Sequence, residues 1–258
     1  MKKSTSVKIV NMLFFSLAII FSLKTVAGLI DFETTASGGT PVDNGIININ
    51  DSFMADGVSV SFGFDTTGDG SVDSHGVFEK RGGGKEGGNS GFMSSYGNKY
   101  DRTATGLESL LGRYFLRQKD AYQPFGTFHI TYDSLNPVTS ASGEIWDIDG
   151  HNNNTEQFFV EAFNGNESLA EILSPLGRRA GRNSLDGKPW AFGFEGLSDI
   201  TRIEISFIGS KESGIGLAFN NFSPVENVSA QINTVPEPLT ITIFAIGIIG
   251  LVSHRWAA

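Results

Sequence analysis

The sequence predicts an all-β protein, a β-sandwich flanked by a signal peptide at one end and a hydrophobic helix at the other. Short runs in which every second residue is apolar predict strands that are buried on one face. Turns rich in glycine separate these runs, and the chain has 32 glycines. Many short strands joined by glycine-rich turns favour a sandwich over a parallel α/β sheet. The 258 residues suffice for one sizeable domain with tails.

Composition excludes several classes of site. The chain has no cysteine, which rules out thiolate-bound zinc, thiol catalysis and a disulfide framework. Its 19 Lys and Arg against 28 Asp and Glu give a formal charge of -9. This balance argues against nucleic acid as a partner, because neutralising phosphates requires clustered cations. An acidic surface fits a soluble protein or one that binds a cation such as calcium.

The first 27 residues have the order of a secretory signal peptide. Lys2, Lys3 and Lys8 precede the largely apolar run Ile9 to Leu23, and small residues end at Ala27. A basic start, an apolar stretch and a small-residue cleavage site predict export through the Sec machinery and removal of residues 1–27. The alternative is an uncleaved anchor, but the run of 15 residues is shorter than a spanning helix.

The other end carries the most specific pattern. Val235, Pro236, Glu237 and Pro238 precede the apolar run 239–252, and Arg255 follows it. The two prolines prevent a helix from continuing back into the domain. The run predicts a hydrophobic helix that enters a bilayer, with Arg255 kept on the cytoplasmic side. A buried core segment is the alternative, and the terminal position beside a cation disfavours it.

This tail resembles the PEP-CTERM sorting signal of Gram-negative bacteria, which joins a Pro-Glu-Pro motif, a hydrophobic helix and a short basic end. The resemblance covers residues 235–258. It implies that exosortase, a membrane enzyme, reads Pro236, Glu237 and Pro238 as substrate residues and cuts near them. It also implies an inner-membrane intermediate and then a place on the cell surface or in the exopolysaccharide matrix.

The body, residues 28–233, is expected to be one domain. Turn-rich stretches are expected at 66–70, 135–137, 150–154 and 209–214. The expected strands carry the following alternating apolar residues: Val58, Val60, Phe62 and Phe64; Phe128, Ile130 and Tyr132; Phe158, Val160 and Ala162; Ile203, Ile205 and Phe207; Ile215, Leu217 and Phe219.

Two segments of the body break the alternation. Leu107, Leu110, Leu111 and Tyr114 recur at helical spacing, but Gly112 interrupts them, so a single helical turn leading into a strand fits as well as a helix. Residues 81–100 hold seven glycines and have no period, which predicts a flexible loop. Its aromatic residues Phe92, Tyr96 and Tyr100 either stack on sugar rings or fasten the loop to the sandwich.

Fragments of the body resemble other PEP-CTERM surface proteins and carbohydrate-binding jelly rolls. These fragments are residues 30–33 (IDFE), 147–150 followed by 156–163, and 217–223 (LAFNNFS). The resemblance implies a sandwich of jelly-roll type in which the first and last strands pair. It also implies a structural calcium ion near the terminal strands, with Glu33 and either Asn220 or Asn221 as ligands.

The segment Asp65 to Asp73 is the strongest internal candidate for calcium. Counted as an EF-hand-like loop, Asp65, Asp69 and Asp73 take the first, fifth and ninth positions and Gly70 the sixth. The third and twelfth positions, Thr67 and Gly76, depart from that pattern. The alternative is an Asp-Gly hairpin turn whose carboxylates are solvated.

Further carboxylates are two residues apart. Residues at this spacing on a strand share a face, so Asp147 with Asp149 is a second candidate ion site, with Glu156 as a further candidate ligand, and Asp31 with Glu33 is a third site. The alternative for each is a carboxylate that is solvated or hydrogen-bonded within the protein.

Catalytic motifs are scarce. No Gly-x-Ser-x-Gly sequence is present, and no two of the histidines lie at metal-ligand spacing. A carboxylate pair of the glycosidase kind remains open, with Glu144, Asp147, Glu156 and Glu161 available. The sequence therefore favours a non-enzymatic surface protein that is structural, adhesive or associated with extracellular polysaccharide. The alternative is a secreted polysaccharide hydrolase or lyase.

Overall fold

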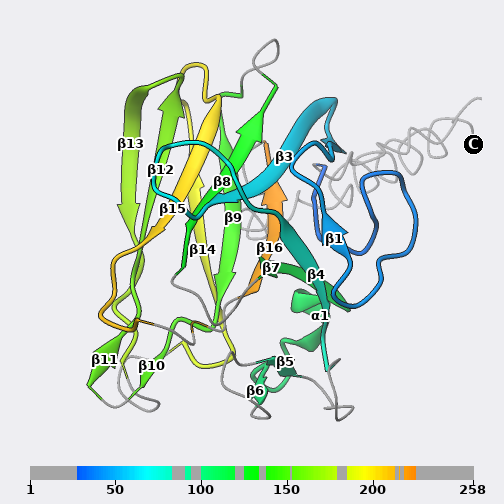
Figure 1. The fold of residues 1–258 in the computed structure, drawn as a ribbon, viewed down its shortest axis with the longest axis vertical. Helices are drawn as coiled ribbons and strands as arrows, with labels where there is room; N and C mark the ends of the chain where they lie inside the picture. The colour runs from blue at the N-terminus through cyan, green and yellow to red at the C-terminus, as the bar shows by residue number, and fades with distance from the viewer. Residues whose placement is uncertain are drawn as a thin grey trace, which may run out of the picture.

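The protein is an all-β sandwich of two antiparallel sheets (Figure 1). This computed structural model describes residues 28–82, 91–93, 100–119, 125–133, 138–151, 153–178, 185–212, 215 and 218–224. The β-sandwich prediction is confirmed. The predicted signal peptide (1–27) and sorting tail (235–258) lie outside these residues. Within the described ranges, no helix has the length and apolar character that crossing a membrane requires.

Each large sheet has six strands, and the chain crosses repeatedly between them. The first has the order β1 (Ile46–Ile47), β4 (Gly76–Lys80), β7 (Tyr114–Gln118), β16 (Ala218–Ser223), β9 (Ala141–Trp146) and β14 (Pro189–Phe194). The second has the order β13 (Glu167–Leu173), β12 (Phe158–Asn164), β15 (Arg202–Phe207), β8 (Thr127–Tyr132), β3 (Val58–Asp65) and β2 (Phe53–Ala55).

Two small hairpins lie at the same end of the sandwich (Figure 1). One pairs β5 (Gly91–Met93) with β6 (Tyr100–Arg102), and the other pairs β10 (Gly150–His151) with β11 (Asn154–Thr155). The first hairpin adds two three-residue strands within and beside the glycine-rich segment 81–100, which was predicted as a flexible loop. Backbone pairing across a glycine-rich sequence leaves no alternation to read. Residues 83–90 and 94–99, with Tyr96, lie outside the described part.

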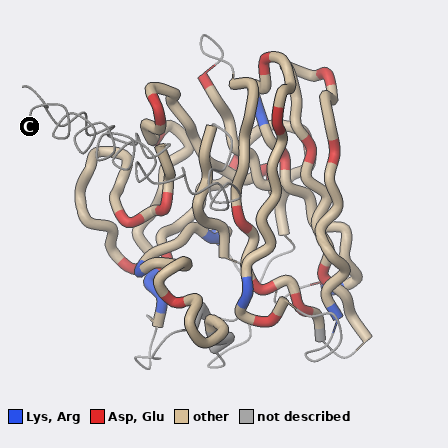
Figure 2. The backbone as a smooth tube through the Cα atoms, turned by 180° about the vertical axis from the view of Figure 1, so that it is seen from behind, with Lys and Arg blue, Asp and Glu red and all other residues tan. Residues whose placement is uncertain are grey.

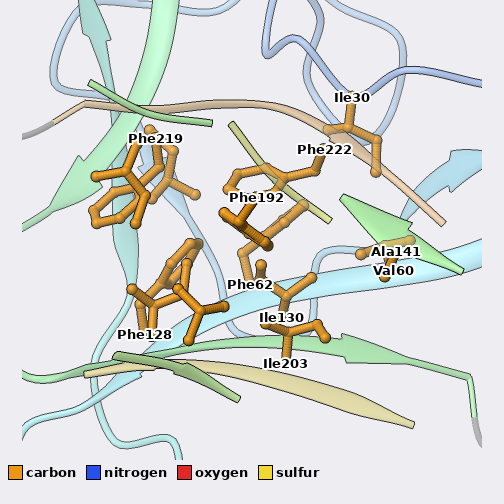
Figure 3. Packing of buried hydrophobic residues seen from close by; sticks show 14 of the residues in the cluster. Ile30, Val60, Phe62, Phe128, Ile130, Ala141, Phe192, Ile203, Phe219 and Phe222 are labelled. Atoms are coloured by element: carbon orange, nitrogen blue, oxygen red, sulfur yellow. The ribbon is translucent and has the colours of Figure 1, made fainter. Parts of the chain in front are cut away.

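Four of the predicted strands form with the predicted face inward. Phe62, Phe64, Phe128, Ile130, Val160 and Ile203 are all buried, and Phe207 packs partly against them. Figure 3 shows Phe219 and Phe222 of one sheet facing Phe62 and Phe128 of the other. Many of the ring pairs meet edge to face, as Phe32 does with Phe62 at 5.2 Å, which is a favoured geometry for aromatic packing.

The last strand starts later than predicted and contains a bulge. β16 begins at Ala218, so Ile215 precedes it, and Leu217 lies outside the described residues. The register with β9 shifts between Asn220 and Ser223, where Asn221 has φ of 54°. Asparagine tolerates this left-handed conformation better than most residues. Because a bulge adds one residue, Phe219 and Phe222 both face the core although they are three apart.

The helical segment is a single turn. α1 (Glu108–Leu111) stops at Gly112, whose φ is 76°, and β7 starts at Tyr114. Leu111 packs on Phe115, Trp146 and Ala218, which point away from the main core. Of the two alternatives that the sequence left open, the structure has the single turn leading into a strand. α1 therefore covers part of the outer face of the first sheet.

Candidate functional site

A half-open pocket lies between the N-terminal segment, α1 and the outer face of strands β9 and β16. We call it the α1–β16 pocket, and its volume is about 460 Å³. It is lined by Leu29, Asp31, Glu33, Arg81, Glu108, Ser109, Leu110, Gly112, Arg113, Glu144, Asn220 and Asn221.

Glu144 and Asn220 form the floor of this pocket. They are directly opposed on neighbouring strands β9 and β16, so their side chains project from the same face. Trp146 Nε1 and Asn221 Nδ2 both donate to Glu144 Oε2, at 3.0 and 2.7 Å. Burial raises the pKa of Glu144, and these two hydrogen bonds only partly oppose that effect.

The two asparagines also hold α1 in place. Asn220 Nδ2 donates to the Leu111 carbonyl at 2.8 Å, and Asn221 Nδ2 lies 3.2 Å from the Leu110 carbonyl. Carbonyls at the end of a helix have no partner within it, so these amides cap α1. The bulge in β16 makes this possible, because it turns two consecutive side chains toward the same layer.

Glu33 forms one wall of the pocket through backbone contacts. Its Oε1 accepts hydrogen bonds from the Arg113 and Tyr114 amides, the latter at 3.0 Å. Asp31 Oδ1 accepts from the Glu33 amide at 3.0 Å. The structure thus brings Glu33, Asn220 and Asn221 to one pocket, as the jelly-roll resemblance implied.

The Asp65–Asp73 segment has its carboxylates occupied by its own loop. Asp65 accepts from the Gly68 amide at 2.6 Å and the Gly70 amide at 2.7 Å. Burial by itself would raise the pKa of Asp65, but the hydrogen bonds have the larger combined effect, so the pKa is lowered. The Thr66 hydroxyl and amide donate to Asp73 Oδ1, and these contacts lower the pKa of Asp73 to about 2.

Asp69 is the third member of that candidate set, and it accepts from the Ser71 amide at 2.8 Å. The three carboxylates therefore stabilise a turn with glycines at positive φ, which matches the hairpin alternative. Across the described residues, no group of three or more His, Asp or Glu side chains is placed to hold a metal ion.

The premise for the Asp147–Asp149 site is wrong. β9 ends at Trp146, so both residues lie in the following loop rather than on one face of a strand. Asp147, at φ of 68°, accepts from the Gly187 amide at 2.8 Å. Asp149 lies beside Glu156 instead, and its amide donates to Glu156 Oε2 at 3.3 Å.

Glu156 is the most deeply buried of the acids considered from sequence. It is 1 % exposed, and Lys211 Nζ donates to its Oε1 at 2.5 Å. Burial raises the pKa of Glu156 to about 7, although the charge of Lys211 opposes the shift. Glu161 lies apart from both Glu144 and Glu156, on β12 of the second sheet, where it accepts a hydrogen bond from the Ser168 hydroxyl. Glu144, Glu156 and Glu161 therefore occupy three separate places.

Charge on the body is mostly acidic. Figure 2 shows Asp and Glu spread over the sandwich, with the fewer Lys and Arg gathered mainly toward one end. Arg81 and Arg113 belong to the α1–β16 pocket, and Arg81 donates to the Glu108 carbonyl. Sequence reasoning missed this pocket as a whole, since its members come from five places in the chain. The Phe-Asn-Asn-Phe sequence at 219–222 was the available signal for the bulge.

Comparison with known proteins gives little. No family model matches the chain, and no curated protein matches it. A solved structure with some likeness is the enzymatically active domain of tailspike protein 4 of bacteriophage CBA120. The match has 16% identity and a TM-score of 0.25, and covers 71% of this chain and 21% of that one. The chain thus spans about a fifth of the tailspike chain, and a likeness this remote carries no argument.

Proposed function

We propose that this chain is an exported protein, sorted through a PEP-CTERM signal to the cell surface or extracellular matrix. There its β-sandwich acts as a structural or adhesive module associated with exopolysaccharide. The observation that carries the proposal is the order of Pro236-Glu237-Pro238, an apolar run and Arg255 at one end, with a signal-peptide pattern at the other. The partners are the Sec machinery, exosortase and, transiently, the membrane.

The placement of the chain ends supports this proposal. Ile30 and Phe222 exchange backbone hydrogen bonds of 2.8 and 3.0 Å in an antiparallel bridge. This bridge brings the first described residues of the body, which follow the predicted cleavage site, beside its last described strand. Both flanking segments therefore join the body at one place. A module tethered there keeps its remaining surface free for contacts.

We further assign the sandwich to the jelly-roll type. Strands β7, β16, β9 and β14 are consecutive in one sheet, and β8, β15, β12 and β13 are consecutive in the other. Taken in chain order, these eight strands alternate between the sheets, apart from the β12–β13 hairpin. This order is that of two interleaved Greek keys.

The test of sorting is the intact mass of the protein recovered from membrane and medium fractions of its own cells. Loss of residues 1–27 and of the tail beyond the motif is expected for the wild type. Glu237→Ala should retain the tail mass, whereas Glu226→Ala, a carboxylate outside the motif, should be trimmed normally. Full-length protein in the cytosol would contradict the proposal.

A secreted polysaccharide hydrolase or lyase is the second candidate function. Glu144 favours it, because a carboxyl whose pKa is raised by burial suits a general acid, and three other carboxylates line the same pocket. Release of reducing ends or unsaturated products from exopolysaccharide, abolished by Glu144→Gln, would establish this function. Binding without turnover would support the non-enzymatic one.

A further inference from the structure

The floor of the α1–β16 pocket has an acceptor with no donor. Asn220 is fully buried, and its Nδ2 is used by the Leu111 carbonyl. Its Oδ1 is buried and accepts no hydrogen bond from any described residue. Such an atom costs free energy unless a water or a ligand supplies a donor. Asn220 lines the pocket, so the donor has to come from that side.

Glu144 supplies a second open acceptor beside it. The hydrogen bonds from Trp146 and Asn221 both go to Oε2, and no described residue donates to Oε1. Since Glu144 and Asn220 are opposed across β9 and β16, their side chains lie roughly 5 Å apart at Cβ. Two neighbouring acceptors on one floor suit a ligand that carries more than one hydroxyl group on the same ring.

The rest of the pocket selects against anions. Asp31, Glu33, Glu108 and Glu144 line it against Arg81 and Arg113, so acids outnumber bases. Leu29 and Leu110, which are 45% and 43% exposed, give the pocket an apolar surface open to a ligand. An uncharged ring with hydroxyls on one edge and C–H groups on its face meets both conditions.

We infer that the α1–β16 pocket binds an uncharged saccharide unit, whose hydroxyls donate to Glu144 and Asn220 while its apolar face lies on Leu29 and Leu110. For the class of ligand, this inference rests on the proposed association with exopolysaccharide. It makes the pocket the place where the sandwich holds a polysaccharide chain.

The test uses the protein recovered from cells, in buffer with chelator, and the methyl glycosides of glucose, galactose and mannose as probes. Saturation-transfer NMR detects binding, and titration gives Kd. At least one glycoside should bind, and the methyl glycoside of glucuronic acid should bind at least tenfold more weakly. Glu144→Gln should raise Kd at least tenfold, whereas Glu171→Gln, an exposed carboxylate on β13 of the other sheet, should leave it unchanged.

A second variant keeps the test valid if Glu144→Gln perturbs folding. Ser109 is exposed and lines the pocket, so Ser109→Trp should fill the pocket and abolish binding without a change in melting temperature. The inference is overturned if no neutral glycoside binds, if the glucuronide binds best, or if Ser109→Trp binds normally. Protein that is trimmed at both ends but binds no glycoside would retire this inference alone and leave the sorting proposal standing.

Discussion

Both faces of β16 are buried, but the outer face buries polar side chains beside the small apolar cluster of Leu111, Phe115, Trp146 and Ala218. On the inner face, Phe219 and Phe222 pack among aromatic rings from the second sheet. On the outer face, Asn220 and Glu144 lie beneath α1 with polar atoms only partly satisfied. Apolar burial stabilises the fold, whereas buried polar groups lower stability unless something pairs with them. The outer face is therefore where binding is expected.

The largest effect is expected from removing a ring of the second sheet that packs against this inner face. Phe128 is fully buried and lies 4.7 Å from Phe219 and 4.8 Å from Phe64, measured between ring centroids. Phe128→Ala should lower the free energy of unfolding by about 3–5 kcal/mol, through lost burial and the cavity that remains. Urea denaturation measures this change. A loss below about 1 kcal/mol would mean that the inner face is not a close-packed core.

Buried carboxylates outside that core should make stability depend on pH. Burial raises the pKa of Glu156 from its ordinary 4.5 to about 7, so the folded state holds a proton that the unfolded state releases. The contribution of Glu156 to the free energy of unfolding is then largest below pH 4.5 and falls as pH rises through 7, whereas the lowered pKa of buried His129 acts in the opposite direction. The raised pKa of Glu144 acts in the same direction as that of Glu156.

Urea denaturation at pH 5 and pH 8 measures this dependence. A loss on the order of 1–3 kcal/mol is expected in the wild type, and a smaller one in Glu156→Gln. Glu171→Gln, at an exposed carboxylate on β13, is the matched control and should keep the wild-type dependence on pH. Equal dependence on pH in the wild type and in Glu156→Gln would contradict the assignment.

Replacing a glycine by alanine tests how tightly each face of the sheet is packed. A Cβ at Gly143 would lie 2.4 Å from a ring carbon of Phe222 and 2.9 Å from one of Phe192. Gly143→Ala should therefore destabilise by about 1–3 kcal/mol, because a packed core cannot absorb the extra volume. Gly193 is the control, since a Cβ there meets nothing closer than 3.7 Å. Equal melting temperatures for the Gly143→Ala and Gly193→Ala variants would show that the inner face accommodates the extra methyl group.

The smallest effect is expected at the acidic hairpin turn. The carboxylates of Asp65, Asp69 and Asp73 already accept hydrogen bonds from their own loop. Calcium must displace those donors to bind, so adding millimolar calcium or chelator should move the melting temperature by less than about 1 °C. A larger stabilisation that disappears in Asp69→Asn would restore the calcium hypothesis for this loop.

Sequence periodicity predicted the inner face better than the outer one. Runs such as 58–64 and 128–132 alternate strictly, because one face meets the core and the other does not. β16 is buried on both faces and contains a bulge, so it shows no simple alternation, and the sequence predicted its start too early, at Ile215. The loop position of Asp147 and Asp149 was also missed. Apolar and acidic residues continue to alternate past Trp146, so the sequence pattern does not show where β9 ends.

The sequence by itself determined the all-β class, most of the apolar core face and the patterns of the two flanking segments, because each depends on residues close together in the chain. Only the tertiary structure decided that Glu33, Glu144 and Asn220 line one pocket. Their meeting depends on strand order and on one bulge, and neither is fixed by local preference. Side chains far apart in sequence become a site only after the sheets are paired.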